Sequence, residues 1–110
     1  MVKITVFYDR PDDPAAFEKY YIETHIPKHG ATFPNCVHLE ANKAIANPGE
    51  TPLYYRTGEL WFEDMASMQK GLQSPRGQAA VADLDNFAKG TYKFLISDVM
   101  PVKLTAETVV

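Results

Sequence analysis

One histidine stands where a helical pattern meets a proline. The pattern runs from Pro14 to about Ile26, and His25 comes two residues before Pro27. Because proline lacks an N–H and disfavours helical geometry in the residue before it, we expect the helix to end near Ile26, with His25 in or beside the last turn. A titratable imidazole held there could transfer a proton during catalysis. It could equally be a helix-end residue that bonds an unpartnered carbonyl.

Aromatic side chains are candidates for binding a flat ligand. Tyr20, Tyr21, Tyr55 and Trp61 carry hydroxyl or indole N–H groups that could orient such a ligand in a pocket. The alternative is plain core packing, which we favour for Tyr21 and Trp61.

Glu59 is a further candidate, with His38 near it on the sheet. By strand alternation Glu59 shares a face with Tyr55 and Trp61. If that face turns toward the helices, Glu59 is a buried carboxylate and could be catalytic or bind a substrate. If it lies at the margin of the strand, Glu59 is a solvated charge, and this is the interpretation we favour.

The spacing of metal-binding and phosphate-binding residue types predicts neither a metal site nor a cofactor. His25 and His29 are four residues apart, but Pro27 lies between them, and no Cys-x-x-Cys or His-Glu-x-x-His pattern supports them. No glycine-rich phosphate loop follows the first strand, which argues against a nucleotide.

Composition limits the classes of protein to which the chain can belong. A chain of 110 residues with a net charge of −3 and no Lys/Arg cluster predicts one domain over residues 1–110 that does not bind nucleic acid. Cys36 is the only cysteine, so no intrachain disulfide can form, which is typical of a reducing compartment such as the cytoplasm. No apolar run reaches the roughly 18 residues of a membrane span, and we expect neither a span nor a secretory signal.

The elements that must position these residues follow from hydrophobic periodicity and turn signals. Alternation predicts strands over residues 2–8, 36–45, 53–62 and 91–100. Asp13-Pro14 and Ser74-Pro75 are typical helix starts, Asp64 begins a shorter helix, and Gly90 is a stop signal. The order strand, helix, strand, strand, helix, strand predicts an α+β, ferredoxin-like sandwich with a four-stranded antiparallel sheet and helices on one face.

The second face of the sheet predicts a partner. Tyr54, Leu60 and Phe62 alternate with Tyr55 and Trp61, so both faces of the third strand carry large apolar groups. An apolar sheet face of several hundred Å² is rarely left in water, which favours a homodimer joined face to face.

The chain resembles the ethyl tert-butyl ether degradation (EthD) family of the dimeric α+β barrel superfamily. The segments that carry this resemblance are Phe7-Tyr8, Pro11, Asp13-Pro14, Phe17, Tyr20-Tyr21, His25-Ile26-Pro27, Glu59-Leu60-Trp61-Phe62, 72–78, Asp83-Leu84 and Asn86-Phe87. The resemblance implies a dimer through the sheets, a ligand cavity between sheet and helices, and His25 as the family's His-x-Pro histidine. Similar folds serve muconolactone isomerases, polyketide cyclases and cofactor-free quinone-forming monooxygenases.

Two functional hypotheses follow. The first is a cofactor-independent enzyme, of oxidoreductase, isomerase or cyclase type, that acts on a small hydrophobic or aromatic oxygenated compound with His25 as its proton-transfer residue. The second is a non-catalytic ligand-binding or accessory protein that supports an oxygenase pathway.

Overall fold

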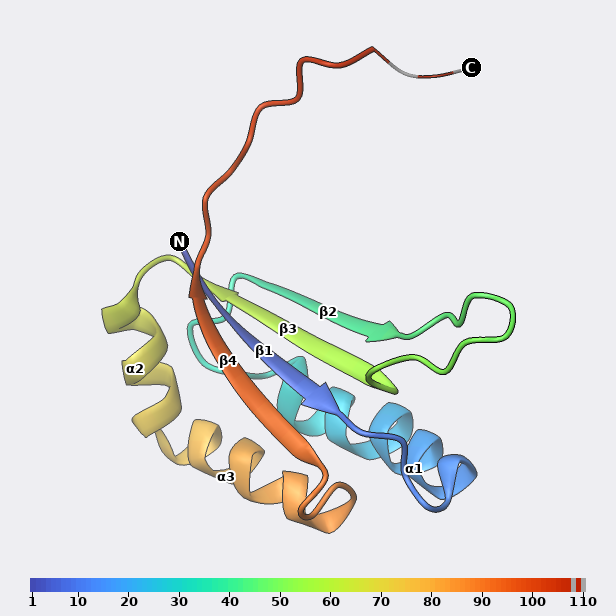
Figure 1. Ribbon diagram of the computed structural model, residues 1–110. Coiled ribbons are helices and arrows are strands. Elements are labelled where there is room, and N and C mark those ends of the chain that lie inside the picture. The colour runs from blue at the N-terminus through green and yellow to red at the C-terminus, as the bar shows by residue number, and fades with distance from the viewer. Residues whose placement is uncertain (108, 110) are drawn as a thin grey trace.

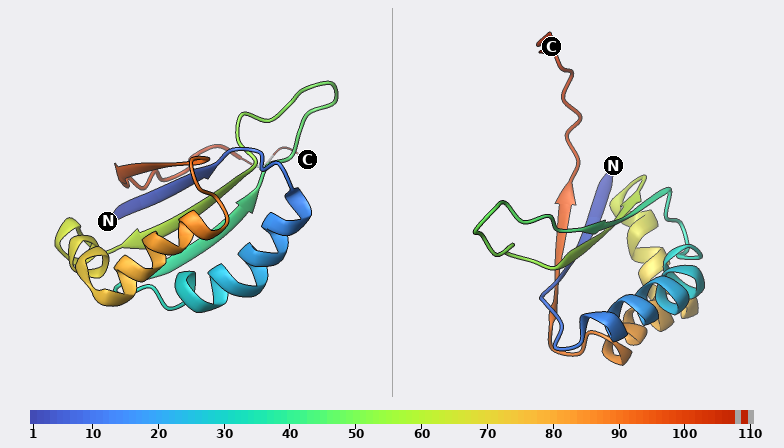
Figure 2. Two further views of the ribbon diagram at one scale, coloured as in Figure 1. Left: turned by 90° about the horizontal axis from the view of Figure 1, so that it is seen from below. Right: turned by 90° about the vertical axis from the view of Figure 1, so that its right-hand side faces the viewer.

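Four antiparallel strands form one sheet in the order β2-β3-β1-β4. The computed structural model describes residues 1–107 and 109. Along the chain the elements are β1 (Val2–Tyr8), α1 (Pro14–Tyr20), η1 (Tyr21–Gly30), β2 (His38–Lys43), β3 (Arg56–Phe62), α2 (Met65–Gln73), α3 (Pro75–Asp83), η2 (Leu84–Asn86) and β4 (Tyr92–Asp98). The helices lie on one side of the sheet, as Figures 1 and 2 show. This arrangement confirms the predicted ferredoxin-like α+β fold, although β2, β3 and β4 are each shorter than predicted.

Three helices begin where the sequence predicted: α2 follows its cap Asp64, and α1 and α3 each follow a cap and a proline. The amide of Ala16 donates to Asp13 Oδ1 at 3.1 Å, and the amide of Gly77 donates to Ser74 Oγ at 3.1 Å. Each cap satisfies an N–H that has no partner inside the helix, and the proline that follows needs no such partner. These local signals fix where α1 and α3 start.

The predicted end of the first helix near Ile26 is wrong. The chain continues from α1 into η1, a π-helical segment with Pro27 inside it, and stops only at Gly30. At its end the amide of Ala31 donates to the carbonyl of Ile26 at 2.7 Å, a bond that spans five residues. A π-helix has wider turns than an α-helix, so the proline ring has more room and its missing N–H removes a single bond. His25 therefore lies inside a helical segment and not at its end.

On the inner strand β1, the side chains of alternate residues face the helices and form the core. Val2, Ile4, Val6 and Tyr8 are all buried there. Phe17 from α1 and Tyr21 from η1 pack on them. The ring centroid of Tyr8 is 5.5 Å from that of Phe17 and 5.4 Å from that of Tyr21. No helix in the described part of the chain is long and apolar enough to cross a membrane.

Strand alternation breaks at the start of β3. Tyr8 is paired with Arg56 in the sheet register, yet its carbonyl also accepts a bond from the amide of Tyr55 at 2.8 Å. Two successive residues thus lie opposite Tyr8, and both are buried. Tyr55 therefore does not share the face of Glu59 as predicted; Tyr54 is on that side instead, 4.6 Å from the ring of Phe7.

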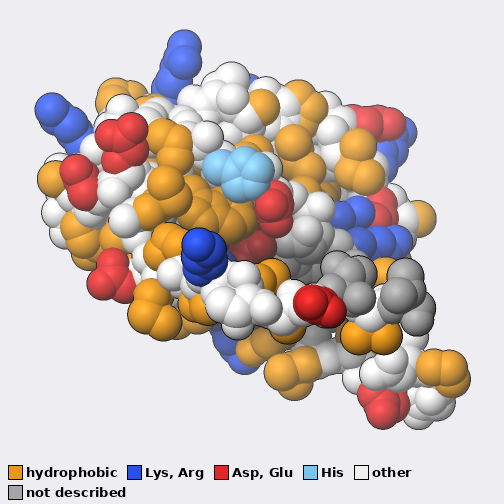
Figure 3. Space-filling view, turned by 90° about the horizontal axis from the view of Figure 1, so that it is seen from above, with side chains coloured by type: hydrophobic (Ala, Val, Ile, Leu, Met, Phe, Trp, Pro, Cys, Tyr) orange, Lys and Arg blue, Asp and Glu red, His pale blue; other side chains and the backbone are white. Residues whose placement is uncertain are grey.

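The sheet face away from the helices is mixed, whereas we predicted it to be apolar. Phe7, Tyr54, Trp61 and Leu95 lie on this open face, together with a polar group. That group contains Lys3, His38, Glu40, Asn42 and Glu59. Figure 3 shows hydrophobic side chains on the upper side of the molecule with acidic, basic and histidine side chains among them.

Candidate functional site

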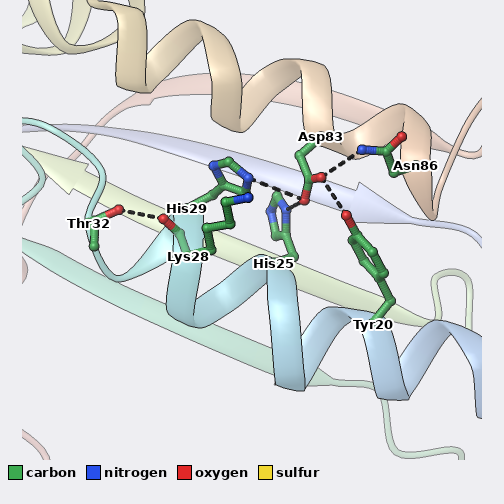
Figure 4. Close-up of polar contacts among 7 residues, drawn as sticks. All are labelled: Tyr20, His25, Lys28, His29, Thr32, Asp83 and Asn86. Carbon is green, nitrogen blue, oxygen red and sulfur yellow. Dashed lines mark hydrogen bonds and ion pairs between the residues drawn. The ribbon is translucent and has the colours of Figure 1, made fainter.

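Four polar side chains contact the buried carboxylate of Asp83 (Figure 4). Its Oδ1 accepts from the hydroxyl of Tyr20 at 2.6 Å and from the amide of Asn86 at 2.8 Å. Its Oδ2 lies 2.8 Å from His25 Nδ1 and 3.7 Å from His29 Nε2. Among these contacts, the bond to His25 joins a titratable imidazole to a fixed negative charge.

Two neighbouring stretches of the chain, α1 with η1 and α3 with η2, position these groups. Tyr20 ends α1, His25 and His29 come from η1, and Asp83 ends α3. His25 and His29 are one turn apart in η1 and lie with their rings 5.8 Å apart, both near Asp83 across the gap between the helices. Asn86 comes from η2, directly after α3.

The electrostatics of the pair favour a neutral imidazole beside an ionised carboxylate. Burial alone would raise the pKa of Asp83, but the hydrogen bonds from Tyr20, Asn86 and His25 together lower it to about 2. Burial lowers the pKa of His25, and the bond to Asp83 opposes this shift without cancelling it. The bond to Asp83 also raises the pKa of Tyr20, which stays a hydrogen-bond donor.

The ionised state of Asp83 determines which ring nitrogen of the neutral His25 carries no proton. An ionised Asp83 requires the proton of a neutral His25 to lie on Nδ1, so Nε2 keeps its lone pair. Nε2 has no hydrogen-bond partner among the described residues, and no fully buried side-chain nitrogen or oxygen in that part of the chain lacks a partner. Nε2 therefore borders open space and can act as a base.

An apolar cavity of about 70 Å³ lies between the sheet and the helices, and His25 is in its wall. Ile4 and Val6 from β1 and Leu60 from β3 form its floor, and Tyr21 and Leu84 approach from the helices. The Tyr21 ring stacks on the His25 ring with their planes 14° apart. His25 thus adds a titratable imidazole to the wall of a hydrophobic space.

The structure brings together two of the predicted site residues and separates the others. Tyr21 and His25 share the cavity wall, and Tyr20 is joined to His25 through Asp83. Tyr20 itself faces an outer groove that it shares with Asn86. The remaining three do not line the cavity.

Those three residues have other surroundings. Tyr55 packs edge-on against Phe17, with ring centroids 5.5 Å apart. Glu59 lies on the open face, where it accepts from Lys3 at 3.0 Å and from Asn42 at 3.0 Å. Trp61 is on the same face, with Lys3 above its ring and His38 beside it.

Sequence reasoning missed the role of Asp83. A signal was present, because Asp83 falls within the apolar stripe of α3 and η2 that includes Ala80 and Leu84, and it is itself buried. An acidic residue on a buried helical face needs partners, and this rule predicts a polar cluster. Its partner, 58 residues away in the chain, could not be deduced from that stripe.

His25 and His29 both lie near one carboxylate oxygen of Asp83. In the described residues no group of three or more His, Cys, Asp or Glu side chains is arranged to hold a metal ion. The arrangement is that of a hydrogen-bonded His–Asp pair.

Comparison with known proteins gives consistent results. The sequence profile of the EthD domain matches residues 10–91. An uncharacterized 11.0 kDa protein from the thcB–thcC intergenic region of Rhodococcus erythropolis is 36% identical over 98 residues, which cover 89% of this chain and 94% of that protein. An EthD family protein from Bacillus halodurans has a TM-score of 0.85 at 26% identity, covering 91% of this chain and 99% of that one. An EthD-like protein from Ralstonia eutropha has a TM-score of 0.71 at 18% identity, covering 93% and 94%.

Proposed function

Because the chain belongs to the EthD family, we propose that it is a cofactor-independent enzyme of small-molecule catabolism with His25 as its proton-transfer residue. The observation that carries this proposal is the 2.8 Å contact between His25 Nδ1 and Asp83 Oδ2 at the wall of an apolar cavity. A carboxylate that fixes the tautomer and orientation of an imidazole is the arrangement that general-base catalysis requires.

The chemistry would proceed from the free nitrogen of His25. Nε2 takes a proton from a carbon next to a carbonyl, or from a phenol, and the imidazole becomes an imidazolium. Asp83 stabilises the new positive charge through the Nδ1–H bond, and Tyr20 and Asn86 hold Asp83 in place. His25 then returns the proton at another atom, which completes an isomerisation or a cyclisation. An oxidation would need dioxygen as the oxidant.

The cavity wall favours a small hydrophobic substrate. Apolar side chains surround the space, so a substrate with one or two oxygens would place its apolar part there and its reactive oxygen near His25. A volume of about 70 Å³ is well below the roughly 150 Å³ of an apolar cavity that holds benzene. An aromatic ring would therefore have to displace side chains of the wall.

The open sheet face supports the second part of the proposal, a homodimer. Trp61, Phe7 and Leu95 lie on this face, and Leu95 is 51% exposed in the protomer. Two proteins with the same fold, from Bacteroides fragilis and Thermobifida fusca, are described as dimeric. We propose that two copies meet through these faces, which also places Glu59 and Trp61 at the interface.

Turnover assays test the role of His25. Candidate lactones and hydroxyquinones are incubated with the wild-type protein, with His25→Gln and with His38→Gln, whose imidazole is on the open face and 56% exposed. We expect His25→Gln to lower kcat about 10²–10⁴-fold, and His38→Gln to leave kcat within about two-fold, because general-base catalysis contributes that much.

The same assays distinguish the hypothesis of an enzyme from that of an accessory protein. Saturable binding of these compounds with no chemical change, and with affinity independent of His25, favours a ligand-binding protein. Equal kcat values for the wild type and His25→Gln would remove His25 from the mechanism.

A further inference from the structure

Two buried tyrosines have hydroxyls without a hydrogen-bond partner. Tyr8 and Tyr21 are 2% and 3% exposed, and both line the apolar cavity with His25. Their hydroxyls form no hydrogen bond with another described residue, whereas those of Tyr20 and Tyr92 donate to carboxylates. A buried tyrosine O–H usually has a partner, because burial removes its bonds to water and leaving it unpaired is costly. The folded protomer therefore leaves two hydrogen-bond donors unused.

Both unpartnered hydroxyls border the cavity. No fully buried side-chain nitrogen or oxygen in the described chain lacks a partner, so these hydroxyls must touch space that a water molecule can enter. The space that Tyr8 and Tyr21 both line is the cavity. The hydroxyl oxygen of Tyr21 lies over β3, 3.4 Å from the point where a Cβ on Gly58 would be, and Gly58 is in the same wall. The ring centroids of Tyr8 and His25 are 5.4 and 5.9 Å from that of Tyr21, so the two donors and the base form one cluster.

Burial keeps both hydroxyls protonated. It raises the pKa of Tyr21 to about 12, although the positive charge of Arg56 opposes the shift. Burial also raises the pKa of Tyr8, and the neighbouring Tyr21 and Asp83 raise it further. At neutral pH each hydroxyl is thus an uncharged donor, whereas Nε2 of His25 is an acceptor and a base.

The rest of the cavity wall carries no fixed charge. None of the described residues that line the cavity is Lys, Arg, Asp or Glu. A charged substrate would lose its hydration there without gaining an ion pair, so the cavity disfavours carboxylates and phosphates. A carbonyl oxygen has two lone pairs and can accept one hydrogen bond from each of the two hydroxyls. The wall therefore favours an uncharged compound with a carbonyl group.

We propose that the hydroxyls of Tyr8 and Tyr21 bind the carbonyl oxygen of the substrate and stabilise the negative charge that forms there when His25 removes a proton from the adjacent carbon. The inference rests on the proposed function of His25 and adds the donors that a base alone does not supply. It also names the substrate class, a small uncharged ketone or lactone with a proton next to its carbonyl. Tyr8 was not among the candidates from the sequence, because its place in the alternation of β1 is that of a core residue.

The reaction step balances within this cluster. The C–H bond next to the carbonyl breaks while an N–H bond forms at Nε2 of His25, and the electron pair of the broken bond becomes the C=C bond of an enolate. The π electrons of the carbonyl move to its oxygen, which accepts hydrogen bonds from Tyr8 and Tyr21. Return of the proton to the same or a conjugated carbon restores the carbonyl, so no oxidant is needed. Fixed donors in a water-poor cavity stabilise the charge that develops in the transition state more than the neutral ground state.

Proton exchange into a small ketone tests the two donors. Butanone is incubated in D2O at neutral pD with the wild type, Tyr8→Phe, Tyr21→Phe and Tyr92→Phe, and NMR measures the replacement by deuterium of the protons next to its carbonyl. Because the loss of one donor to an oxyanion costs about 10²–10³-fold, we expect Tyr8→Phe and Tyr21→Phe each to lower the exchange rate constant about 10²-fold or more. Tyr92→Phe removes a hydroxyl that donates to Asp85 outside the cavity, and we expect it to leave the rate constant within about two-fold.

Urea unfolding of the same variants separates a catalytic from a structural role. Since the hydroxyls of Tyr8 and Tyr21 have no partner among the described residues, replacing either ring with phenylalanine should not lower the free energy of unfolding. A loss of stability in either variant would show that its hydroxyl stabilises the fold, and this would contradict the proposal.

The carbonyl resonance of the bound ketone tests the hydrogen bonds apart from the base. Butanone labelled with ¹³C at the carbonyl is titrated with the wild type, His25→Gln and the double variant Tyr8→Phe/Tyr21→Phe. We expect a downfield shift of the carbonyl resonance in the first two proteins and its loss in the double variant, because hydrogen bonds to the oxygen withdraw electrons from the carbon. If the shift is kept while proton exchange does not depend on His25, the proposed function fails and the tyrosine site stands. If exchange depends on His25 but neither the rate nor the shift changes in the tyrosine variants, or if the wild type does not shift the resonance, the donor pair is overturned.

Discussion

His25 and Asp83 are 58 residues apart in the chain and joined by a 2.8 Å contact between Nδ1 and Oδ2. The contact pairs a base with the group that sets its tautomer, and it closes the gap between η1 and α3. Tyr20 and Asn86 occupy the other carboxylate oxygen, so Asp83 has little freedom to turn away from His25. This constraint gives Asp83 a positioning role that can be measured apart from the role of His25.

Asp83→Asn should impair catalysis without removing the imidazole. An amide that donates to Nδ1 favours the other tautomer, so the proton moves to Nε2 and the free base is lost. We expect kcat to fall about 10²-fold or more with little change in KM. Asp85→Asn is the control, since Asp85 is exposed and contacts Tyr92 instead. A kcat for Asp83→Asn equal to that of the wild type would show that Asp83 does not orient the base.

The pH dependence of activity should reflect the lowered pKa of His25. Since burial lowers this pKa below the ordinary value of 6.5, Nε2 stays unprotonated at pH 7 and the acid limb of kcat/KM should have its midpoint below 6.5. An NMR titration of the His25 ring should give the same midpoint, and a value above 6.5 would contradict the assignment. In Asp83→Asn the midpoint should fall further, because Asp83 opposes the effect of burial.

Stability should follow the same two groups. The unfolded chain binds a proton at histidine below pH 6.5, where folded His25 is still neutral, so the free energy of unfolding should decrease as the pH falls below 6.5. The pKa of Asp83 is lowered to about 2, so its contribution is complete above its unfolded value near 4 and is lost as the pH falls toward 2. Urea unfolding at pH 7, 5.5 and 3 measures both steps, and a constant free energy of unfolding would contradict them.

The open face should control dimerisation. Leu95→Asp places a charge at a half-exposed apolar position beside Thr5, and we expect it to raise the dimer Kd about ten-fold or more. Ala79→Asp, on the exposed side of α3, should leave the Kd unchanged. A dimer Kd for Leu95→Asp equal to that of the wild type would contradict the face-to-face dimer.

The corner between α2 and α3 has no room for a methyl group. A Cβ on Gly77 would overlap the carbonyl oxygen of Gly71, which is backbone and cannot move aside cheaply. Despite the better helix propensity of alanine, Gly77→Ala should lower the free energy of unfolding by about 1–3 kcal/mol. Gly30→Ala is the comparison, since a Cβ there meets Leu39 Cδ2 at 3.4 Å, and it should cost less in the same denaturant series.

The sequence by itself determined the order of the elements, the three helix starts and the side chains that alternate on β1. These features depend on residues that are close together in the chain: a cap with its proline, or a strand with period two. They were sufficient to predict the ferredoxin-like fold and to select His25 as a candidate.

Tertiary structure decided what depends on distant residues. A proline ends most helices, but here the helical chain continues past Pro27 as the π-helical segment η1, which packs against α3. His25 therefore lies inside the segment. The break in alternation at Tyr55 put that ring under α1 and left Glu59 on the open face, because Tyr8 is opposite two successive residues. Asp83 became the partner of His25 through the approach of two helices, a contact that no local pattern contains because its free energy comes from packing across the whole protomer.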